Sequence, residues 1–294
     1  MNVRPITKGD APAVAALADA DEIALRGHSS HIGPHDVLDW WSRSDLERNT
    51  WLFEDGGAAV AAGWFSPWGD KATFAGVVAQ EWKGRGIGAD IVERAETRGR
   101  ESGLARMHTW VLPEDAAAMA LFAGRGYREV RRFYDMAIAL DATPPEPVVP
   151  ARLLLDDFRV EDSRAFQEAL HEAFQDHWEW HGVPYDEWWE MREGDDHSLW
   201  YVVRDGDEIA AAVRNETGRL GGGYVAIIGV RRPWRGQGIA KALLYRSFGE
   251  FWKRGISRVT LGVDAESPTG ATKLYESVGM HVESENVVFE RAVA

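Results

Sequence analysis

The sequence predicts two tandem α/β domains, each a mixed central sheet flanked by helices. Three observations lead to this prediction: the length of 294 residues, a proline-rich segment near the middle, and a block that recurs on both sides of it. A chain of this length exceeds most single compact domains, so two separate cores are expected. With 45% hydrophobic and 27% charged residues, the composition is that of a globular protein.

The domain boundary is expected in the segment DATPPEPVVP at 141–150. Its four prolines stop regular structure and favour an extended spacer. We therefore expect an N-terminal domain at 1–142, a linker at 143–150 and a C-terminal domain at 151–294.

Two blocks repeat across this linker. VAQEWKGRGIG at 78–88 and VRRPWRGQGIA at 230–240 share Val, Trp, two Gly and Ile, and Gly86 and Gly238 are 152 positions apart. AMALFAGRGY at 118–127 matches ATKLYESVGM at 271–280 with a shift of 153. Two matched blocks in the same order indicate duplication of one domain.

The first half begins with an extended segment at 3–7 and a helix from about Ala11. β-Branched and aromatic residues with two-residue alternation predict strands at 51–54, 58–64, 72–78, 108–112 and 128–140. An amphipathic helix is expected between the glycine-rich loop and about Arg100, and a short one at 116–123.

The second half repeats this order. Strands are expected near 200–204, 209–214, 224–230, 258–263 and 287–291. One helix follows the glycine-rich loop and another begins at about Gly270. Strands interleaved with helices predict mixed sheets.

The glycine-rich loop at 235–240, RGQGIA, lies between an apolar strand and a helix. Glycine lets the backbone approach a ligand closely, and the first turn of a helix offers free N–H groups to phosphate. Neither copy has the GxxxxGK[ST] of a P-loop, and a dinucleotide-binding loop would come earlier in its domain. One such loop alone is also typical of an ordinary turn, but two copies at matched positions predict a pyrophosphate-bearing ligand.

At these residues the chain resembles the GCN5-related N-acetyltransferase (GNAT) superfamily. The acyl-CoA loop of that superfamily has Arg or Gln, then Gly three positions later and Gly or Ala five positions later, as at Arg235, Gly238 and Ala240. Lys83 replaces the first residue in the other copy. The resemblance continues through 263–280 and implies an acyltransferase that uses acetyl-CoA and releases coenzyme A. The tandem arrangement is also similar to that of the mycothiol synthases.

The resemblance implies a set of residues that bind acetyl-CoA. In the C-terminal copy these are Ile228, Val230, Arg235, Gly236, Gln237, Gly238, Ile239, Ala240, Lys241 and Ser267, the last at a position where the family commonly has Asn. In the N-terminal copy they are Val78, Gly84, Arg85, Gly86, Ile87 and Gly88, so that copy could bind acetyl-CoA as well.

Catalysis in this family uses a tyrosine acid on the helix after the fifth strand, and Tyr275 matches it. The N-terminal copy has Phe122 there, which has no proton to donate, so that domain is expected to be degenerate. The glutamate base that relatives carry on the fourth strand is missing from 224–230, YVAIIGV. Glu216, His177 and His181 remain as alternative bases, and purely structural roles remain open for Tyr275 and for these histidines.

The acceptor site is expected around 171–189, where three His and four Trp lie among carboxylates. Aromatic faces beside carboxylates suit a cationic or amino-sugar-like primary amine, with Phe174, Trp178, His181 and Tyr185 as the expected contacts. Core packing would explain the aromatic residues equally well. Between 156 and 208, 17 acidic residues face 4 basic ones, which is typical of a solvated surface or of a cleft that attracts cations.

Composition narrows the remaining classes. The absence of cysteine excludes disulfides, thiolate metal sites and cysteine nucleophiles, and no metal is expected. A net charge of −14 argues against a nucleic-acid partner, and so against an aminoacyl-tRNA-dependent transferase of similar architecture. No apolar run reaches the roughly 20 residues of a membrane span, so we expect a cytoplasmic monomer or homodimer without a membrane partner. A non-catalytic acyl-CoA sensor is the competing hypothesis.

Overall fold

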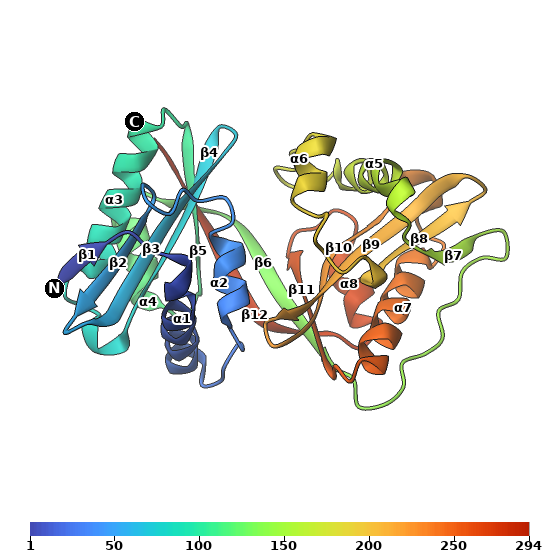
Figure 1. Cartoon of the computed structure of the whole chain (residues 1–294), viewed down its shortest axis with the longest axis horizontal. Coiled ribbons are helices and arrows are strands. Elements are labelled where there is room, and N and C mark those ends of the chain that lie inside the picture. Colours follow the sequence, from blue (N-terminus) through green and yellow to red (C-terminus); the bar gives the residue numbers. More distant parts are fainter. Residues whose placement is uncertain (294) are drawn as a thin grey trace. The chain divides into compact units, whose positions relative to one another are not determined.

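The computed structural model describes residues 1–293, which form two compact units (Figure 1). Unit 1 consists of Met1–Phe133, Arg219–Gly221 and the residues from Ser284 onward. Unit 2 consists of Tyr134–Gly218 and Gly222–Glu283. Each contains mixed strands and flanking helices, so the predicted α/β fold class is confirmed.

Unit 1 follows the order expected for the first half, with an additional helix, α2. Its elements are β1 (Asn2–Arg4), α1 (Ala11–Arg26), α2 (Pro34–Trp40), β2 (Thr50–Asp55), β3 (Ala58–Trp68), β4 (Lys71–Val78), α3 (Ile87–Glu101), β5 (Arg106–Val111), α4 (Ala116–Gly124) and the first part of β6 (Arg128–Ala139). β1 to β4 pair antiparallel and β4 pairs parallel with β5, which makes the sheet mixed.

Both faces of the unit 1 sheet are covered because β3 is apolar on both sides. Phe65 packs with Ile91 of α3 in one buried cluster, whereas its neighbour Trp64 packs with Val14 of α1 in another. Successive strand residues point to opposite faces, so the apolar run of β3 serves two helical layers. Gly63 and Gly76 leave the space that the Ile91 side chain occupies.

Unit 2 repeats this arrangement. Its elements are β7 (Leu154–Asp157), α5 (Ser163–Phe174), α6 (Tyr185–Glu190), β8 (Trp200–Asp205), β9 (Glu208–Arg219), β10 (Gly222–Val230), α7 (Ile239–Lys253), β11 (Arg258–Asp264), α8 (Ala271–Glu276), the second part of β6 and the beginning of β12 (His281–Ala292). β7, β8 and β9 pair antiparallel, and β10 pairs parallel with β11.

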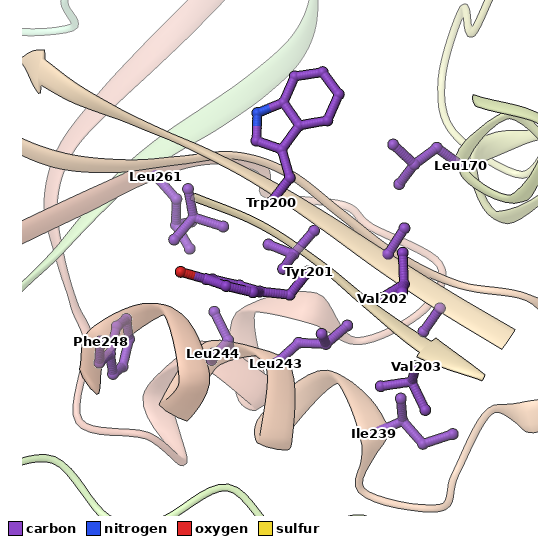
Figure 2. Close-up of a cluster of buried hydrophobic side chains, with 14 of the residues drawn as sticks. Leu170, Trp200, Tyr201, Val202, Val203, Ile239, Leu243, Leu244, Phe248 and Leu261 are labelled. Atoms are coloured by element: carbon purple, nitrogen blue, oxygen red, sulfur yellow. The ribbon is translucent and has the colours of Figure 1, made fainter. Parts of the chain in front are cut away.

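The core of unit 2 is formed on both faces of β8 (Figure 2). Tyr201 points toward Leu244 of α7, and the preceding Trp200 points to the opposite face. There its ring stacks on Phe166 of α5 at a centroid distance of 5.0 Å. The strand therefore joins a layer containing α5 to a layer containing α7, and these layers border the site described below.

The last strand of each half lies in the unit formed mainly by the other half. Val287–Ala292 of β12 pair antiparallel with Val111–Arg106 of β5 in unit 1. From Tyr134 onward, β6 belongs to unit 2, where it neighbours β11. The linker expected at 143–150 carries no helix or strand, so a segment without regular secondary structure connects β6 to β7. Each unit thus contains residues from both sequence copies.

Over residues 1–293, no helix combines the length and the apolar character needed to cross a bilayer.

Candidate active site

A gap opens between the parallel strands β10 and β11 in unit 2. Over the described residues, their register pairs are Gly223 with Val259 and Tyr224 with Thr260. β10 nevertheless continues to Val230 and β11 to Asp264. The two strands therefore diverge after Tyr224, and the gap widens toward their carboxyl ends. We call its closed end, at Tyr224 and Thr260, the apex.

A change of face along β10 accompanies the gap. A Cβ on Gly223 would meet Phe251 of α7, whereas a Cβ on Gly229 would meet Ala173 of α5. Residues six apart in a regular strand point to the same face, so the alternation shifts by one between these glycines. Such a shift is a β-bulge, which bends a strand and is common beside active sites. The bulge explains why β10 turns away from β11.

The gap leads to the glycine-rich loop. Gly236 and Gly238 have φ values of 74° and 78°, and a Cβ on either would meet nothing within 4 Å. Glycine is thus required for the left-handed backbone and not for space. Ala242 donates the first helical hydrogen bond of α7 to Gly238 O at 3.1 Å, so the preceding N–H groups point out of the helix end. This cradle suits a diphosphate.

Arg235 fastens the loop to its surroundings. Its Nε donates to Val230 O at 3.1 Å and its Nη2 to Ala173 O at 2.9 Å, while Asp176 lies 3.0 Å from its Nη1. The guanidinium therefore connects the loop to β10 and to α5. Among the predicted acyl-CoA residues, Arg235 acts through its side chain as an anchor, and the loop backbone remains available to a ligand.

The other predicted acyl-CoA residues of this copy border the gap. Ile228 and Val230 are half-buried on β10. Lys241 Nζ donates to Ser277 O at 3.2 Å, which ties α7 to the end of α8. In the turn after β11, Ser267 Oγ lies 3.0 Å from Thr269 Oγ1. Hydroxyl and ammonium groups therefore lie on both sides of the open end of the gap.

Tyr275 is buried on α8, with 7% of its surface exposed. Burial raises the pKa of its phenol well above the usual value, and the nearby Tyr224 raises it further. The phenol is consequently protonated throughout the physiological range. Tyr224 belongs to the last register pair, so the phenol group predicted as the acid interacts with a residue at the apex.

His177 follows α5, and its ring stacks on Phe174 at 4.1 Å. Burial lowers the pKa of His177, although the carboxylates of Asp264 and Asp176 act in the opposite direction. The imidazole is thus neutral near pH 7, as a base requires. Glu216, the alternative base, contacts Arg214, which also lies 3.4 Å from Asp195.

The residues predicted to contact the acceptor have different surroundings. The Phe174 ring lies 4.9 Å from Trp180 and close to the backbone at Gly229. Tyr185 Oη lies 2.6 Å from Ser163 Oγ, which docks α6 on α5. Trp178 is half-buried and His181 is exposed. Phe174 is the member of this group that contacts β10.

Arginines neutralise much of the acidic stretch at 156–208. The pairs include Asp156 with Arg204, Asp157 with Arg246, Asp162 with Arg204, Glu172 with Arg231, Asp176 with Arg235, Asp195 with Arg214 and Asp196 with Arg254. The stretch is therefore a network of surface ion pairs, and attraction of a cationic acceptor depends on individual carboxylates.

Unit 1 has the same loop with different surroundings. Gly84 and Gly86 have φ values of 75° and 86°, and Asp90 donates to Gly86 O at 3.0 Å, as Ala242 does to Gly238 in unit 2. Lys83 Nζ, however, lies 2.6 Å from Asp21 and 3.1 Å from Asp115. Val78, Arg85, Ile87 and Gly88 complete the predicted set, and the Arg85 guanidinium lies over the Trp82 ring.

Phe122 of unit 1 stands where unit 2 has Tyr275. Its ring lies 5.9 Å from Phe74 and 5.2 Å from Tyr127 in a buried aromatic cluster. Phe122 itself has no ionisable group, although the neighbouring Tyr127 has a buried phenol. The degenerate character expected for the N-terminal copy stays a prediction.

Two carboxylates near the gap were not singled out from the sequence. Asp264 ends β11 and affects the pKa of His177. Asp135 lies on β6, where a Cβ added to Gly262 would be 3.8 Å from its Oδ1. The position of Asp264 directly after a predicted strand was an available signal. Asp135 carried none, because nothing local relates β6 to the second copy.

Comparisons with known proteins show the family of this chain. A model of the acetyltransferase (GNAT) family matches residues 15–127 and 163–280. Among curated relatives, the mycothiol acetyltransferase of Thermobispora bispora is 26% identical and that of Propionibacterium freudenreichii subsp. shermanii is 25% identical. The alignments cover 97% of this chain and 97% of the former, and 99% of this chain and 94% of the latter.

Solved structures show the same tandem architecture. A GCN5-related N-acetyltransferase from Sphaerobacter thermophilus is 31% identical, with a TM-score of 0.86 over 99% of this chain and 95% of that one. A tandem GNAT protein from the clavulanic acid biosynthesis pathway is 17% identical, with a TM-score of 0.76 over 100% of this chain and 98% of that one. The second likeness concerns the fold alone.

Proposed function

Because this chain belongs to the GNAT acetyltransferase family, we propose that its unit 2 transfers the acetyl group of acetyl-CoA to a primary amine of a small acceptor. The family is one of acetyl-CoA-dependent N-acetyltransferases, so the chain is a transferase with acetyl-CoA as its donor. The acceptor is a cationic or amino-sugar-like amine in this proposal.

The β10–β11 gap and the loop after it are the proposed donor site. The N–H groups from Gly236 to Lys241 hold the diphosphate, and the β10 backbone at Ile228 and Val230 lies along the gap. When bound there, acetyl-CoA supplies a carbonyl carbon already activated as a thioester. The chain then has only to position the amine and manage two protons.

Tyr275 is the proposed acid for the departing sulfur. Its buried phenol is protonated at neutral pH, and Tyr224 at the apex raises the pKa of this phenol further. Direct attack by the amine on the thioester needs no thiol on the protein, which suits a chain without cysteine. His177 and Glu216 are the bases proposed from the sequence.

The acceptor is proposed to approach from the side of the gap covered by α5. Phe174 packs near Gly229 of β10, and His177 stacks on it, so an aromatic wall borders this side. Trp178, His181 and Tyr185 follow in the same segment. Aromatic faces favour a cation and also suit the apolar face of a sugar ring.

The observation that carries this proposal is the divergence of β10 from β11 next to two left-handed glycines at a helix start. A thiol-release assay tests it, with acetyl-CoA and a panel of polyamines, amino sugars, aminoglycosides and amino acids. Amine-dependent release, with the acetylated product identified by mass, is the expected result. Tight acetyl-CoA binding without amine-dependent release would instead favour a non-catalytic acyl-CoA sensor.

The full-length match to proteins named mycothiol acetyltransferase favours one specific alternative acceptor. The cysteinyl pseudodisaccharide amine acetylated by such enzymes therefore belongs in the panel. β10 lacks the glutamate base of those relatives, since 224–230 reads YVAIIGV. We therefore expect a different amine to be preferred, and a preference for the cysteinyl amine over the other classes would identify this alternative as correct.

A further inference from the structure

One carboxylate reaches the apex of the unit 2 gap from outside the second sequence copy. We propose that Asp135 binds the ammonium group of the acceptor and accepts the proton that its nitrogen loses, an inference that rests on the proposed function. Asp135 lies on β6, which follows the first copy of the repeat but contributes its second part to unit 2.

The first step is the geometry around Gly262 of β11. A Cβ at this position would lie 3.5 Å from Tyr224 Oη and 3.8 Å from Asp135 Oδ1. Gly262 is exposed, whereas Val263 beside it is buried. A phenol and a carboxylate therefore border the same small space, which is open to solvent because residue 262 has no side chain.

The second step is the location of this space. Tyr224 pairs with Thr260 in the last register pair before the strands diverge. Gly262 lies two residues further along β11, on the same face as Thr260. Asp135 and Tyr224 therefore stand at the apex, and Tyr224 interacts with the proposed acid Tyr275.

The third step is a comparison with unit 1. Trp110 corresponds to Gly262, since the two positions are 152 apart like the paired loop glycines. β5 pairs with β12 there, and Val288 is the register partner of Trp110. Unit 1 therefore has an indole and an aliphatic side chain where unit 2 has an open space and a carboxylate. The copy without the tyrosine acid also lacks this carboxylate.

The fourth step is chemical. A primary amine is mostly an ammonium ion at neutral pH, and a carboxylate both attracts that ion and takes its proton. β10 supplies no acidic residue anywhere in its sequence GGYVAIIGV. Asp135 thus provides, from a neighbouring strand, the group that β10 lacks.

The proton and bond balance closes with the groups present. Deprotonation by Asp135 leaves a lone pair on the nitrogen, which forms the new C–N bond as the C–S bond breaks. Asp135 passes this first proton to water before the attack, so that it can take one of the two protons left on the nitrogen, while the other stays on the amide. The sulfur takes one proton from Tyr275. Both side chains then exchange protons with water, which returns them to their starting states.

Thiol release from acetyl-CoA is measured with glucosamine, with spermidine and without amine, so that water is the third acceptor. Asp135→Asn keeps the shape and removes the charge, and turnover is expected to fall about 100-fold. Asp135→Glu is expected to retain a larger fraction. Formate is expected to restore part of the activity of Asp135→Ala, which a purely structural role would not allow. Glu129→Gln is the control, being an exposed carboxylate on the same strand.

Calorimetry provides a readout besides activity. Affinity for glucosamine or spermidine, measured without acetyl-CoA, is expected to fall about tenfold in Asp135→Asn through loss of a charge-assisted contact. Affinity for acetyl-CoA is expected to stay within about twofold. The Glu129→Gln variant is expected to match the wild type in both measurements.

The outcomes separate this inference from the proposed function. Wild-type turnover and amine affinity in Asp135→Asn would overturn the inference and leave the proposed function intact. If the wild type released no thiol with glucosamine, spermidine, water or the wider amine panel, both the inference about Asp135 and the proposed function would be overturned. Should Asp135→Asn unfold, Asp135→Ala with formate decides, because a folded Asp135→Ala without rescue would also overturn the inference.

Discussion

Burial shifts the pKa values of two side chains beside the gap in opposite directions. It raises the pKa of the Tyr275 phenol, which is protonated at pH 7, and lowers the pKa of the His177 imidazole, which is neutral there. One group therefore has a proton to give and the other a lone pair to receive one. Neither shift was evident from the sequence, where a tyrosine on a helix and a histidine in an aromatic segment are compatible with simple packing roles.

The Tyr275 phenol can be tested by removing a single oxygen. Tyr275→Phe is expected to lower turnover about 10- to 1000-fold with little change in acetyl-CoA affinity, because only the proton donor is lost. Steady-state thiol release and calorimetry measure the two quantities. Since Tyr275 is 7% exposed, its ring packing is retained in the variant. Unchanged turnover would remove Tyr275 from the mechanism.

Acid stability tests the lowered pKa of His177. Its folded pKa lies below its unfolded value of about 6.5, so the unfolded chain binds a proton at a higher pH than the folded chain. This difference reduces stability as the pH falls through about 6.5. When the pH falls from about 7.5 to about 5.5, the melting temperature of His177→Gln is therefore expected to decrease less than that of the wild type.

The exposed His181 offers a matched control for this experiment. His181→Gln removes one histidine from the same segment and leaves the half-buried ring of His177 in place. An acid-induced loss of melting temperature in His177→Gln equal to that of the wild type would mean that the imidazole is not held neutral by burial.

Two glycines of the strand–loop–helix element have different backbone conformations. Gly238 has a φ of 78°, whereas Gly249 lies inside α7, and a Cβ at either would meet nothing within 4 Å. Gly238→Ala is expected to lower the free energy of unfolding by about 1–2 kcal/mol and to weaken acetyl-CoA binding at least about tenfold, since the loop must change its backbone. Gly249→Ala is expected to raise the free energy of unfolding by about 0.5–1 kcal/mol without affecting acetyl-CoA affinity.

Denaturant unfolding and calorimetry separate these effects. The pair of variants adds the same methyl group to the same loop–helix element, so a general effect of mutation would appear in both. Wild-type acetyl-CoA affinity in Gly238→Ala would contradict the role given to the left-handed turn.

The sequence predicts most elements because their signals are local. Apolar runs rich in β-branched and aromatic residues identify β3, β4, β8 and β10, and the recurring glycine block locates α3 and α7. The short α2, α6 and β7 were not predicted. α6 is held by Tyr185 on Ser163 and by its neighbouring tryptophans, which are tertiary contacts with no pattern of their own.

The exchange of the last strands could not be predicted from the sequence. β6 and β12 are both closing strands with a short apolar segment among charged residues, so their sequences do not show which sheet each one completes. The choice is made by packing, as for Val287 and Phe289 of β12 in the core of unit 1. The donor loop was therefore predicted from its motif, whereas the carboxylate of Asp135 emerged only from three-dimensional topology.

At the scale of the whole chain, duplication has produced two units with unequal surroundings for the same loop. Arg235 connects its loop to β10 and α5, on one side of the gap. Lys83 connects its loop to Asp21 of α1 and to Asp115, which follows β5. The register pairs of β4 and β5 end at Thr73 with His108, although β4 continues to Val78 and β5 to Val111, so a gap opens in unit 1 as well. The contact with Asp115 joins the two walls of that gap.

The ion pairs of Lys83 with Asp21 and Asp115, here called the Lys83 bridge, oppose opening of the gap in unit 1, and their groups are partly buried. Burial pulls the pKa of Lys83 down, but the contacts with Asp21 and Asp115 outweigh it and the net pKa is raised. Asp115 Oδ1 also accepts a hydrogen bond from the Ala118 N–H at 2.9 Å, which caps α4. Opening the gap would therefore break an ion pair and disturb a helix start.

We accordingly expect one acetyl-CoA per chain, bound by unit 2. Gly86→Ala in unit 1 is the mirror of Gly238→Ala, since its φ is 86° and a Cβ there would also meet nothing within 4 Å. It is expected to cost about 1–2 kcal/mol of stability and to leave acetyl-CoA affinity and stoichiometry unchanged. Isothermal calorimetry measures both. Two sites of similar affinity, with one lost in Gly86→Ala, would mean that the Lys83 bridge opens readily and that both units hold the donor.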